Sequence, residues 1–560
     1  MQAQMERPWL KVPLDGRYAI LPPERRPVYA VLSDSAKAHP NNLCIHYEGR
    51  NLTYSQVDEM SSRFASGLVS LGLKKGERVA LFLPNIPQLV IGFFGILKAG
   101  GIVVMCNPTY KERELEHQLK DSETSIIVAS RTVAKGLDLY KSLADCRANL
   151  SLKHVITTSL ADYLPPMKRR LAGLAGIKDV ERADTIDFLS LVESNAPIET
   201  PVAVDPEEDI ALLQYTGGTT GLSKGAMLTH YNLVSNASYG VPFFPLSEKD
   251  ISLCVLPLFH IYGLTVTMNA PLAAGACLVL LPSFHVDEVM KAIQDRKVTV
   301  FCGAPAMYIA INSRPDVKKY DLRSIRACLS GGSALPPAVR RQFMALTGGN
   351  LVEGYGLSET SPVTHCNPIK GGVVKDGSIG PPFSGTDAIV VDLVGNWRRL
   401  PAGEVGELAV KGPQVMKGYW NQKGETEAVM NEGWFLTGDI AKMDEDGYFY
   451  IVDRKKDMIN VGGFKVYPRE VEDLLFEHPA IKEAGVIGVP DAFSGEVVKA
   501  FVVLKDPSKK VTEQEVIDFC LQHLAKFKAP KQVEFVEALP KTLLGKVLRR
   551  KLRESKPEQP

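Results

Sequence analysis

The chain has 560 residues, of which 45% are hydrophobic and 23% are charged, and its formal net charge is +1. A chain of this length exceeds what one hydrophobic core supports, so we expect two or more domains, one of them large. Because the net charge is close to zero, the composition gives no reason to expect a nucleic-acid partner, and a charged ligand must be met by local groups.

The cysteines and the N-terminus bear on the compartment. The nine cysteines are scattered along the chain and form no C-x-x-C pair, which argues against a disulfide framework and against structural zinc. The first residues, MQAQMERPWLKVPL, lack a basic segment followed by an apolar core, so secretion is not expected. We therefore expect a cytoplasmic protein.

The N-terminal part alternates between strand-like and helix-like patterns. Residues 78–83, 88–98 and 101–105 have the apolar pattern of a strand, a helix and a strand, and similar alternation returns near residues 126, 155, 210, 254, 278 and 300. This order predicts an α/β fold with largely parallel sheets. Residues 163–178 combine basic and apolar side chains. We favour a solvated surface helix there, and contact with the inner face of a membrane is the alternative.

A loop rich in glycine and hydroxyl groups, YTGGTTGLSKGA at residues 215–226, follows a predicted strand. The glycines let the backbone approach a ligand closely, the hydroxyls donate hydrogen bonds and the lysine adds a positive charge, so we expect a phosphate-binding loop. It is not a Walker A loop, since Gly221 is followed by Leu222 rather than by lysine. The groups expected at the phosphates are Thr216, Gly217, Gly218, Thr219, Thr220, Gly221 and Lys224.

The longest apolar stretch, residues 251–281, carries almost no charge. Because Pro257, Pro271 and Gly275 interrupt it, buried strands joined by a helix explain it better than a membrane-spanning helix. His260 is the only titratable group in the apolar run LPLFHIYGL. By itself it is interpreted as a core residue with satisfied hydrogen bonds.

The motif EGYGLSET, residues 353–360, combines an aromatic residue with a carboxylate, as a nucleotide site requires. We expect Tyr355, held by its neighbour Gly356, to stack on a purine ring. Glu359 is suited to hold Mg²⁺ against the phosphates, and Thr360 to donate to one of them. A capped helix start would give a similar pattern.

Further groups suit the rest of a nucleotide. In LSGGSALP, residues 329–336, Gly332 and Ser333 offer backbone that can flank an adenine ring. Asp439 in WFLTGDIA and Arg454 in VDRKKD are suited to contact the ribose hydroxyls. Each of the two charged residues, taken alone, is more often an ordinary surface charge or a member of an ion pair.

The pattern changes after residue 380. Residues 380–411 are interpreted as short strands separated by glycine and proline, which predicts a small β unit. The charged junction 453–459 is a candidate hinge. Beyond it, a helix at 468–477, strands near 486 and 501 and a helix at 512–524 predict a compact α+β unit. Lys546 lies on a turn in the basic run 541–553 and on its own would be a surface lysine.

Taken together, the motifs resemble those of the adenylate-forming superfamily of acyl-CoA synthetases, luciferases and peptide-synthetase adenylation domains. The match covers nearly the whole chain, in the order YTGGTTGLSKGA, LPLFHIYGL, YGLSET, WFLTGDIA, DRKKDMINVGGFKVYP and PKTLLGKVLRR. The continuous segment NEGWFLTGDIAKMDEDGYFYIVDRKKDMI is most similar to bacterial long-chain fatty-acid:CoA ligases.

The resemblance implies a fold of two domains. The large N-terminal domain, residues 1–453, would consist of two mainly parallel α/β sheets and a small β-barrel-like unit. A small, mobile α+β C-terminal domain, residues 454–560, would rotate about a hinge near Lys456 between two half-reactions.

The resemblance also implies a reaction in which a fatty acid, ATP and CoA give acyl-CoA, AMP and pyrophosphate through an acyl-adenylate. Lys546 would bridge the carboxylate and the α-phosphate, and His260 would position the acyl carboxylate. Mg²⁺ would be held by Glu359 and Thr216.

Two C-terminal positions match family residues that act with CoA or AMP. Gly463 corresponds to a glycine lining the pantetheine tunnel of CoA, and Lys465 to a polar residue near the AMP phosphate. Asn460 stands where plant and beetle relatives carry lysine, so that lysine's role is not transferred.

Alternatives remain at this point. The acid can be a medium-chain or aryl acid, or the acyl group can pass to a separate carrier protein. A non-catalytic binding or transport protein is a third alternative, against which Lys546 and Glu359 argue. The expected partners are fatty acid, ATP and CoA, with no nucleic acid, and a homodimer and peripheral membrane contact stay open.

Overall fold

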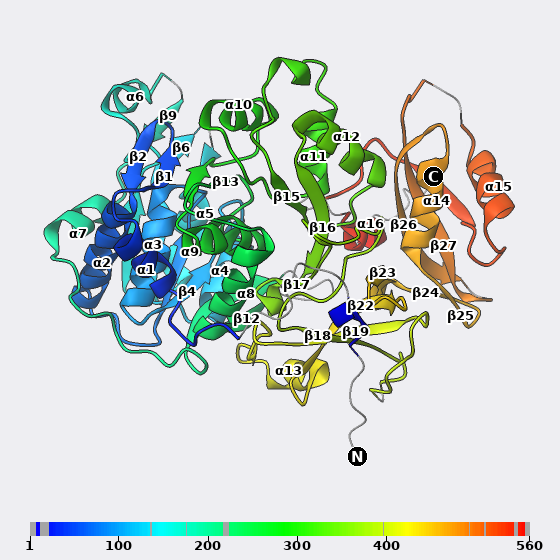
Figure 1. Cartoon of the computed structure of the whole chain (residues 1–560). Coiled ribbons are helices and arrows are strands. Elements are labelled where there is room, and N and C mark those ends of the chain that lie inside the picture. Colours follow the sequence, from blue (N-terminus) through cyan, green and yellow to red (C-terminus); the bar gives the residue numbers. More distant parts are fainter. Residues whose placement is uncertain are drawn as a thin grey trace.

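The computed structural model describes residues 7–11, 22–134, 137–174, 176–216, 223–395, 397–491, 493–508, 511–541 and 547–554. Figure 1 shows two N-terminal sheets covered by helices, a smaller β unit beneath them, and a C-terminal unit at one side, in orange and red.

The first sheet has eight strands in the order β10, β8, β5, β3, β4, β11, β12, β20. In that order they span Ile186–Asp187, His154–Thr158, Ile126–Ser130, Arg78–Phe82, Ile102–Met105, Ile210–Thr216, Lys224–Thr229 and Gly418–Tyr419. Neighbours from β10 to β11 are parallel, whereas β12 and β20 are antiparallel additions. The predicted parallel α/β pattern is confirmed, and the apolar residues of α3 (Pro87–Lys98) explain why that helix is entirely buried.

A second group of strands forms a four-stranded sheet and a three-stranded sheet. Strands β13 (Ile251–Cys254), β14 (Cys277–Leu280) and β1 (Leu43–Tyr47) are parallel, and β2 (Arg50–Thr53) closes that sheet antiparallel to β1. Single bridges at Val300 join β13 to β15, which starts a three-stranded sheet with β16 and β17. Those strands span Ala327–Ser330, Asn350–Gly356 and Val363–Cys366.

The apolar stretch 251–281 folds as predicted, with β13 and β14 joined by a π-helix (Gly263–Asn269) and α9 (Ala270–Ala273). Within the described parts of the chain, no helix is both long and apolar enough to cross a membrane.

The predicted β unit extends beyond residue 411. It is a five-stranded antiparallel sheet of β18, β19, β22, β21 and β23. These strands span Asp387–Val391, Gly406–Lys411, Trp434–Met443, Met430–Asn431 and Phe449–Arg454.

The C-terminal unit has its own sheet and its own buried cluster, which includes Val466, Val471 and Val486. Its strands are β24 (Ile459–Val461), β25 (Phe464–Val466), β26 (Ile481–Asp491), β27 (Gly495–Leu504) and β28 (Gln532–Phe535). The predicted helices appear as α14 (Pro468–Glu477) and α15 (Glu513–His523), and α16 (Arg549–Glu554) follows.

The remaining elements are helices and one small sheet. The helices are α1 (Ala30–Ala38), α2 (Tyr54–Ser70), α4 (Glu112–Asp121), α5 (Lys141–Cys146), α6 (Pro166–Leu171), α7 (Phe188–Ser194), α8 (His230–Phe243), α10 (Val286–Arg296), α11 (Pro305–Asn312), α12 (Pro337–Thr347) and α13 (Lys423–Val429). A small sheet contains β6 (Thr132–Ala134), β7 (Leu137–Asp138) and β9 (Ile177–Asp179).

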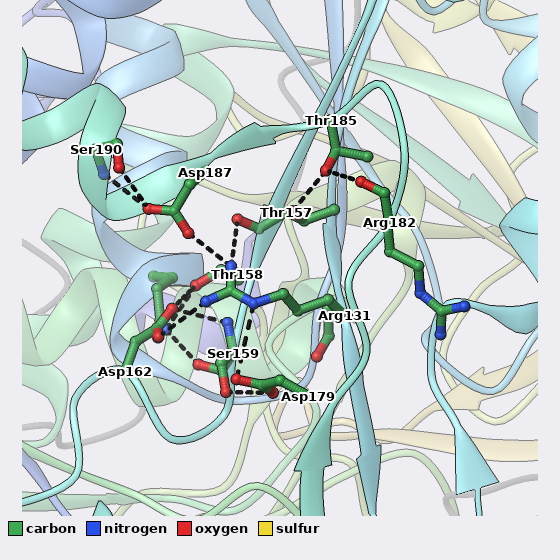
Figure 2. A network of polar contacts seen from close by, with 12 residues as sticks. Arg131, Thr157, Thr158, Ser159, Asp162, Asp179, Arg182, Thr185, Asp187 and Ser190 are labelled. Carbon is green, nitrogen blue, oxygen red and sulfur yellow. Dashed lines mark hydrogen bonds and ion pairs between the residues drawn. The ribbon is translucent and has the colours of Figure 1, made fainter.

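One arginine fixes the loops at the carboxyl ends of β5 and β8, as Figure 2 shows. Arg131 lies 2.7 Å from Asp187, 3.4 Å from Asp162 and 3.7 Å from Asp179. Asp162 also accepts from the Thr158 hydroxyl at 2.8 Å. The segment that carries α6 is therefore anchored at both ends by the same guanidinium.

Candidate active site

The two ends of the predicted phosphate loop lie opposite each other. Thr216 at the end of β11 pairs in antiparallel register with Lys224 at the start of β12. The loop residues Gly217, Gly218, Thr219, Thr220 and Gly221 lie outside the described residues. Their contact with phosphate stays a prediction.

Helix α4 braces both stems of this loop. Tyr215 donates from Oη to Asp121 Oδ2 at 2.5 Å, and His117 donates from Nε2 to the Ser223 carbonyl at 2.9 Å. The Trp420 indole donates to the Asp121 carbonyl at 3.1 Å. We did not predict these supports from the sequence, because α4 lies about a hundred residues before the loop.

Lys224 has two partners that come from much later in the chain. It forms an ion pair with Glu425 of α13, and its Nζ lies 5.2 Å from the ring centroid of Tyr419. The lysine and Glu425 are 201 residues apart, so no local pattern pointed to the contact.

Glu359 lies in a 3₁₀ turn, Ser358–Thr360, that follows β16. Its Oε1 accepts a hydrogen bond from Tyr419 Oη at 2.9 Å, and its backbone carbonyl accepts from Met416 N at 2.8 Å. Burial raises the pKa of Glu359 above its usual value. The predicted phosphate donor Thr360 is buried, and its hydroxyl donates to the Pro362 carbonyl at 2.6 Å in this structure.

The Glu359 carboxylate suits a hard cation such as Mg²⁺ that takes its other ligands from the phosphates of a nucleotide. In the described part of the chain, the hydrogen bond from Tyr419 is the only side-chain hydrogen bond that reaches this carboxylate. No group of three or more His, Cys, Asp or Glu residues that can hold a metal is found among the described residues. Mg²⁺ commonly takes one or two carboxylates together with substrate phosphates, which matches this arrangement.

The predicted purine and ribose residues are joined to each other. Tyr355 donates from Oη to Asp439 Oδ2 at 2.5 Å. Asp439 stands opposite Arg454 in the register of β22 and β23, and Arg454 Nε lies 3.2 Å from Asp439 Oδ1. The structure thus brings Tyr355 together with Asp439, 84 positions later, and with Arg454 on the next strand of the same antiparallel pair.

The turn that is predicted to flank adenine follows strand β15. Ser330 at the end of β15 is paired in parallel register with Glu353 of β16, so Gly332 and Ser333 follow β15 while Tyr355 lies near the end of β16. Both turn residues are exposed. Buried Glu353 accepts from Leu335 N at 3.2 Å, and burial raises its pKa to about 7.

His260 is held on the segment that follows β13. Its Nδ1 accepts from Tyr262 N at 3.2 Å, and burial lowers its pKa to about 4. The imidazole is therefore neutral at pH 7 and carries its proton on Nε2, which can donate. The segment itself is fixed by Asn85, whose Oδ1 accepts from Leu258 N at 2.8 Å and whose Nδ2 donates to the Leu256 carbonyl at 2.8 Å.

The predicted hinge contains a cluster of charges. Lys456 lies in the 3₁₀ turn Lys455–Asp457, and partial desolvation together with the charge of Arg454 lowers its pKa to about 8. Arg549 of α16 bridges Asp453 at 3.1 Å, Asp457 at 3.2 Å and Glu472 at 2.7 Å. It ties both sides of the junction together.

Two further predicted C-terminal residues, Gly463 and Lys465, lie on one hairpin of the C-terminal unit. Gly463, with a φ of +88°, and exposed Lys465 are on the hairpin of β24 and β25, which Figure 1 shows at the lower end of the C-terminal unit. A Cβ at Gly463 would meet no atom within 4 Å in this arrangement. Lys546 lies outside the described residues.

Comparisons with known proteins cover nearly the whole chain. The sequence model of the family described as AMP-binding enzyme matches residues 32–420, and that of the AMP-binding enzyme C-terminal domain matches residues 470–546. A long-chain-fatty-acid–CoA ligase of Bacillus subtilis (strain 168) is 46% identical over 565 residues, covering 99% of each chain. One of Salmonella typhimurium is 40% identical over 570 residues, covering 98% of each chain. The structure of ATP-bound MatB from Rhodopseudomonas palustris superposes with a TM-score of 0.83 at 32% identity, covering 94% of this chain and 98% of MatB.

Proposed function

Since the chain belongs to the AMP-binding enzyme family, we propose that it is an ATP-dependent long-chain fatty acyl-CoA synthetase. The observation that supports this most is that the predicted site residues form two groups of contacting side chains. In one group, Lys224 and Glu359 both contact Tyr419. In the other, Tyr355 and Arg454 both contact Asp439.

The reaction has two steps. A carboxylate oxygen of the fatty acid attacks the α-phosphorus of ATP, and the bond to the β-phosphate oxygen breaks, so pyrophosphate leaves. The CoA sulfur, having lost its proton, then attacks the acyl carbon, and the bond from that carbon to the AMP oxygen breaks.

The first step brings two anions together. Two unit charges 4 Å apart repel by about 1 kcal/mol in water and about 4 kcal/mol at the effective dielectric of a protein site. Cationic groups must offset this repulsion, and Lys224 and Lys546 are the candidates from this chain. Mg²⁺ held by Glu359 and Thr216 would neutralise charge on the phosphates when it is bound with ATP.

The nucleotide end uses the joined trio. The Tyr355 ring and the turn at Gly332 and Ser333 would enclose the adenine. Asp439 accepts from the ribose hydroxyls and Arg454 donates to them, while the Tyr355 hydroxyl keeps the Asp439 carboxylate in place.

His260 orients the acid. Because its Nδ1 is engaged by Tyr262 N, the ring presents the N–H of Nε2 as a donor. A neutral donor of this kind can hydrogen-bond one oxygen of the fatty-acid carboxylate without pairing with it as an ion.

An apolar wall for the acyl chain is available beside this segment. Tyr239 and Phe243 of α8 pack with Phe383, with ring centroids 6.4 and 5.1 Å apart, and Tyr262 to Leu264 begin the π-helix region. Each methylene buried there contributes about 0.8 kcal/mol, so chain length alone gives selectivity.

The second step requires a different face of the C-terminal unit. We propose that residues 454–560 rotate about Lys456, which withdraws Lys546 and brings Gly463 to the site. The positive φ of Gly463 and the open space around it suit a position that a pantetheine arm passes closely.

A membrane contact is also proposed, through the α6 segment. Met167, Leu171 and Leu174 are 76%, 51% and 87% exposed, and Lys168, Arg169 and Arg170 lie among them. Exposed apolar groups next to cations suit binding to an anionic bilayer. Such a bilayer would also supply the apolar acid.

Leu174→Asp should reduce co-sedimentation with phosphatidylglycerol vesicles. Val394→Asp, at another site that is 87% exposed, should not.

The test of the proposed function is a panel of acids assayed for CoA-dependent AMP release. Palmitate and oleate should give higher kcat/KM than octanoate, benzoate or cinnamate. Preference for octanoate or for an aryl acid would replace the long-chain assignment. Transfer that occurs with a carrier protein and fails with CoA would replace the CoA assignment.

A further inference from the structure

Tyr419 contacts three segments of the candidate phosphate site, which we call the phosphate half. These segments are strand β12 with Lys224, the turn with Glu359, and helix α13. Tyr419 belongs to β20 (Gly418–Tyr419), the last strand of the eight-stranded sheet. The flanking Lys417 and Trp420 donate backbone N–H groups to β12 at 2.9 and 2.8 Å. The N–H of Tyr419 donates to Thr426 Oγ1 of α13 at 2.9 Å. Its backbone is therefore fixed on both sides.

The Tyr419 side chain contacts both charged groups of the phosphate half. Its Oη donates to Glu359 Oε1 at 2.9 Å, and its ring lies beneath Lys224, with Nζ 5.2 Å from the ring centroid. One contact uses the hydroxyl and the other uses the ring. A rigid ring with a backbone held in place thus sets the position of a carboxylate and of an ammonium group that come from separate segments.

The other partner of Lys224 constrains it less. Glu425 is 51% exposed and Lys224 is 32% exposed. Ion pairs at such positions contribute little, because water screens them and two flexible side chains must be ordered. A hydrogen bond to a carboxylate and a cation above an aromatic ring are both more directional. Tyr419 therefore carries more of the positional information than Glu425 does.

We propose that Tyr419 is a positioning residue of the phosphate half, which holds Glu359 for the metal ion and Lys224 for the phosphates at a fixed separation. This inference rests on the proposed function, since it assigns the metal ion and the phosphates to these two groups. Beyond that function, the positions of Glu359 and Lys224 both depend on one side chain outside the phosphate loop.

The test uses full-length protein and two substitutions with different effects. Tyr419→Phe keeps the ring under Lys224 and removes the hydrogen bond to Glu359, whereas Tyr419→Leu removes both contacts. Tyr448→Phe is the matched control. Tyr448 donates from Oη to the Val373 carbonyl at 2.6 Å and has Lys375 Nζ 4.4 Å from its ring centroid, in the separate β unit.

Binding is measured by calorimetry with ATP and no acid substrate, once with MnCl₂ and once with EDTA. Tyr419→Phe should weaken ATP binding with Mn²⁺ by about tenfold, as expected for loss of one hydrogen bond to a charged group. It should leave binding in EDTA unchanged. Tyr419→Leu should weaken both, and Tyr448→Phe neither.

Two results overturn the inference. One is Mn²⁺-dependent ATP binding by Tyr419→Phe that equals that of wild type. The other is an equal loss with and without metal, which would indicate general damage to the site. Failure of the proposed function is seen separately, as absence of acid-dependent pyrophosphate exchange in the wild-type protein, and the calorimetry still decides the role of Tyr419 in that case.

Discussion

Asp439 and Arg454 face each other across β22 and β23, with Arg454 Nε 3.2 Å from Asp439 Oδ1. The side chain of Asp439 is only 5% exposed, so its charge relies on Arg454 and on the hydrogen bond from Tyr355. We propose that this pair is the preformed acceptor and donor for the two ribose hydroxyls.

Asp439→Asn should weaken ATP binding, because a neutral amide replaces a carboxylate that accepts from the ribose. We expect the KM for ATP to rise by about tenfold, the effect of one hydrogen bond to a charged group. Asp444→Asn is the matched control, since Asp444 also accepts from a tyrosine, Tyr450, and pairs with a cation, Lys375. Steady-state kinetics with ATP varied decides. A KM for Asp439→Asn no higher than that for Asp444→Asn would remove Asp439 from the ribose site.

His260→Asn should lower kcat/KM for the acid by about tenfold, the scale of one lost hydrogen bond to a charge. The Asn Oδ1 can still accept from Tyr262 N, but the Nε2 donor is gone. Because burial holds the pKa of His260 near 4, wild type and variant should share the same pH profile between pH 6 and 8. A wild-type inflection near pH 6.5 that the variant lacks would contradict this. His230→Asn is the control, since His230 Nδ1 likewise accepts a backbone N–H, from Val28 at 3.1 Å.

Glu353 predicts a pH-dependent stability. Its pKa is raised from 4.5 to about 7 by burial, so the folded protein binds a proton that the unfolded chain has lost. Its contribution to stability is present below pH 4.5 and is lost as the pH rises through 7, a change of up to about 3 kcal/mol. Glu353→Gln keeps an acceptor for Leu335 N without the charge.

Thermal unfolding of wild type and Glu353→Gln at pH 5 to 8 checks this expectation. The variant should gain stability over wild type as the pH increases. Two curves that run parallel across the range would show that Glu353 is not protonated in the folded state.

The sequence allowed most elements to be predicted but few of the partners. Strand β11, helix α14 and the buried run 251–281 follow from apolar spacing, which is a local property. The motif residues Tyr355, Asp439 and Arg454 were found, but the Asp439–Arg454 contact depends on the β22–β23 register and the Tyr355–Asp439 contact on how β16 packs against β22, which spacing alone does not show.

Other site residues carried no local signal. Tyr419, Glu425 and Asn85 act through contacts with segments far away in the chain, and each stands in a stretch whose pattern is ordinary. The burial that changes the pKa of Glu353 and His260 likewise arises only when sheets pack. Such features require the tertiary structure.

Arg549→Met should loosen the hinge. It leaves Asp453, Asp457 and Glu472 without their shared cation, and removal of one partner from a buried charge cluster costs about 3 to 5 kcal/mol. Limited proteolysis followed by mass spectrometry should show faster cleavage within residues 453–459. Arg550→Met is the control, because Arg550 pairs only with the exposed Glu554 among the described residues. Equal cleavage of the two variants would mean that Arg549 does not hold the junction.

We propose that one C-terminal unit serves two half-reactions with two different faces. The most direct measurement compares adenylation, read as acid-dependent pyrophosphate exchange, with thioester formation from supplied acyl-adenylate, in Lys546→Ala and Gly463→Leu. Gly462→Leu controls for strain, because Gly462 also has a positive φ, of +59°. Lys546→Ala should reduce adenylation by roughly 10²-fold or more and spare thioester formation, whereas Gly463→Leu should do the reverse. Loss of the same half-reaction in both variants would contradict the use of two different faces.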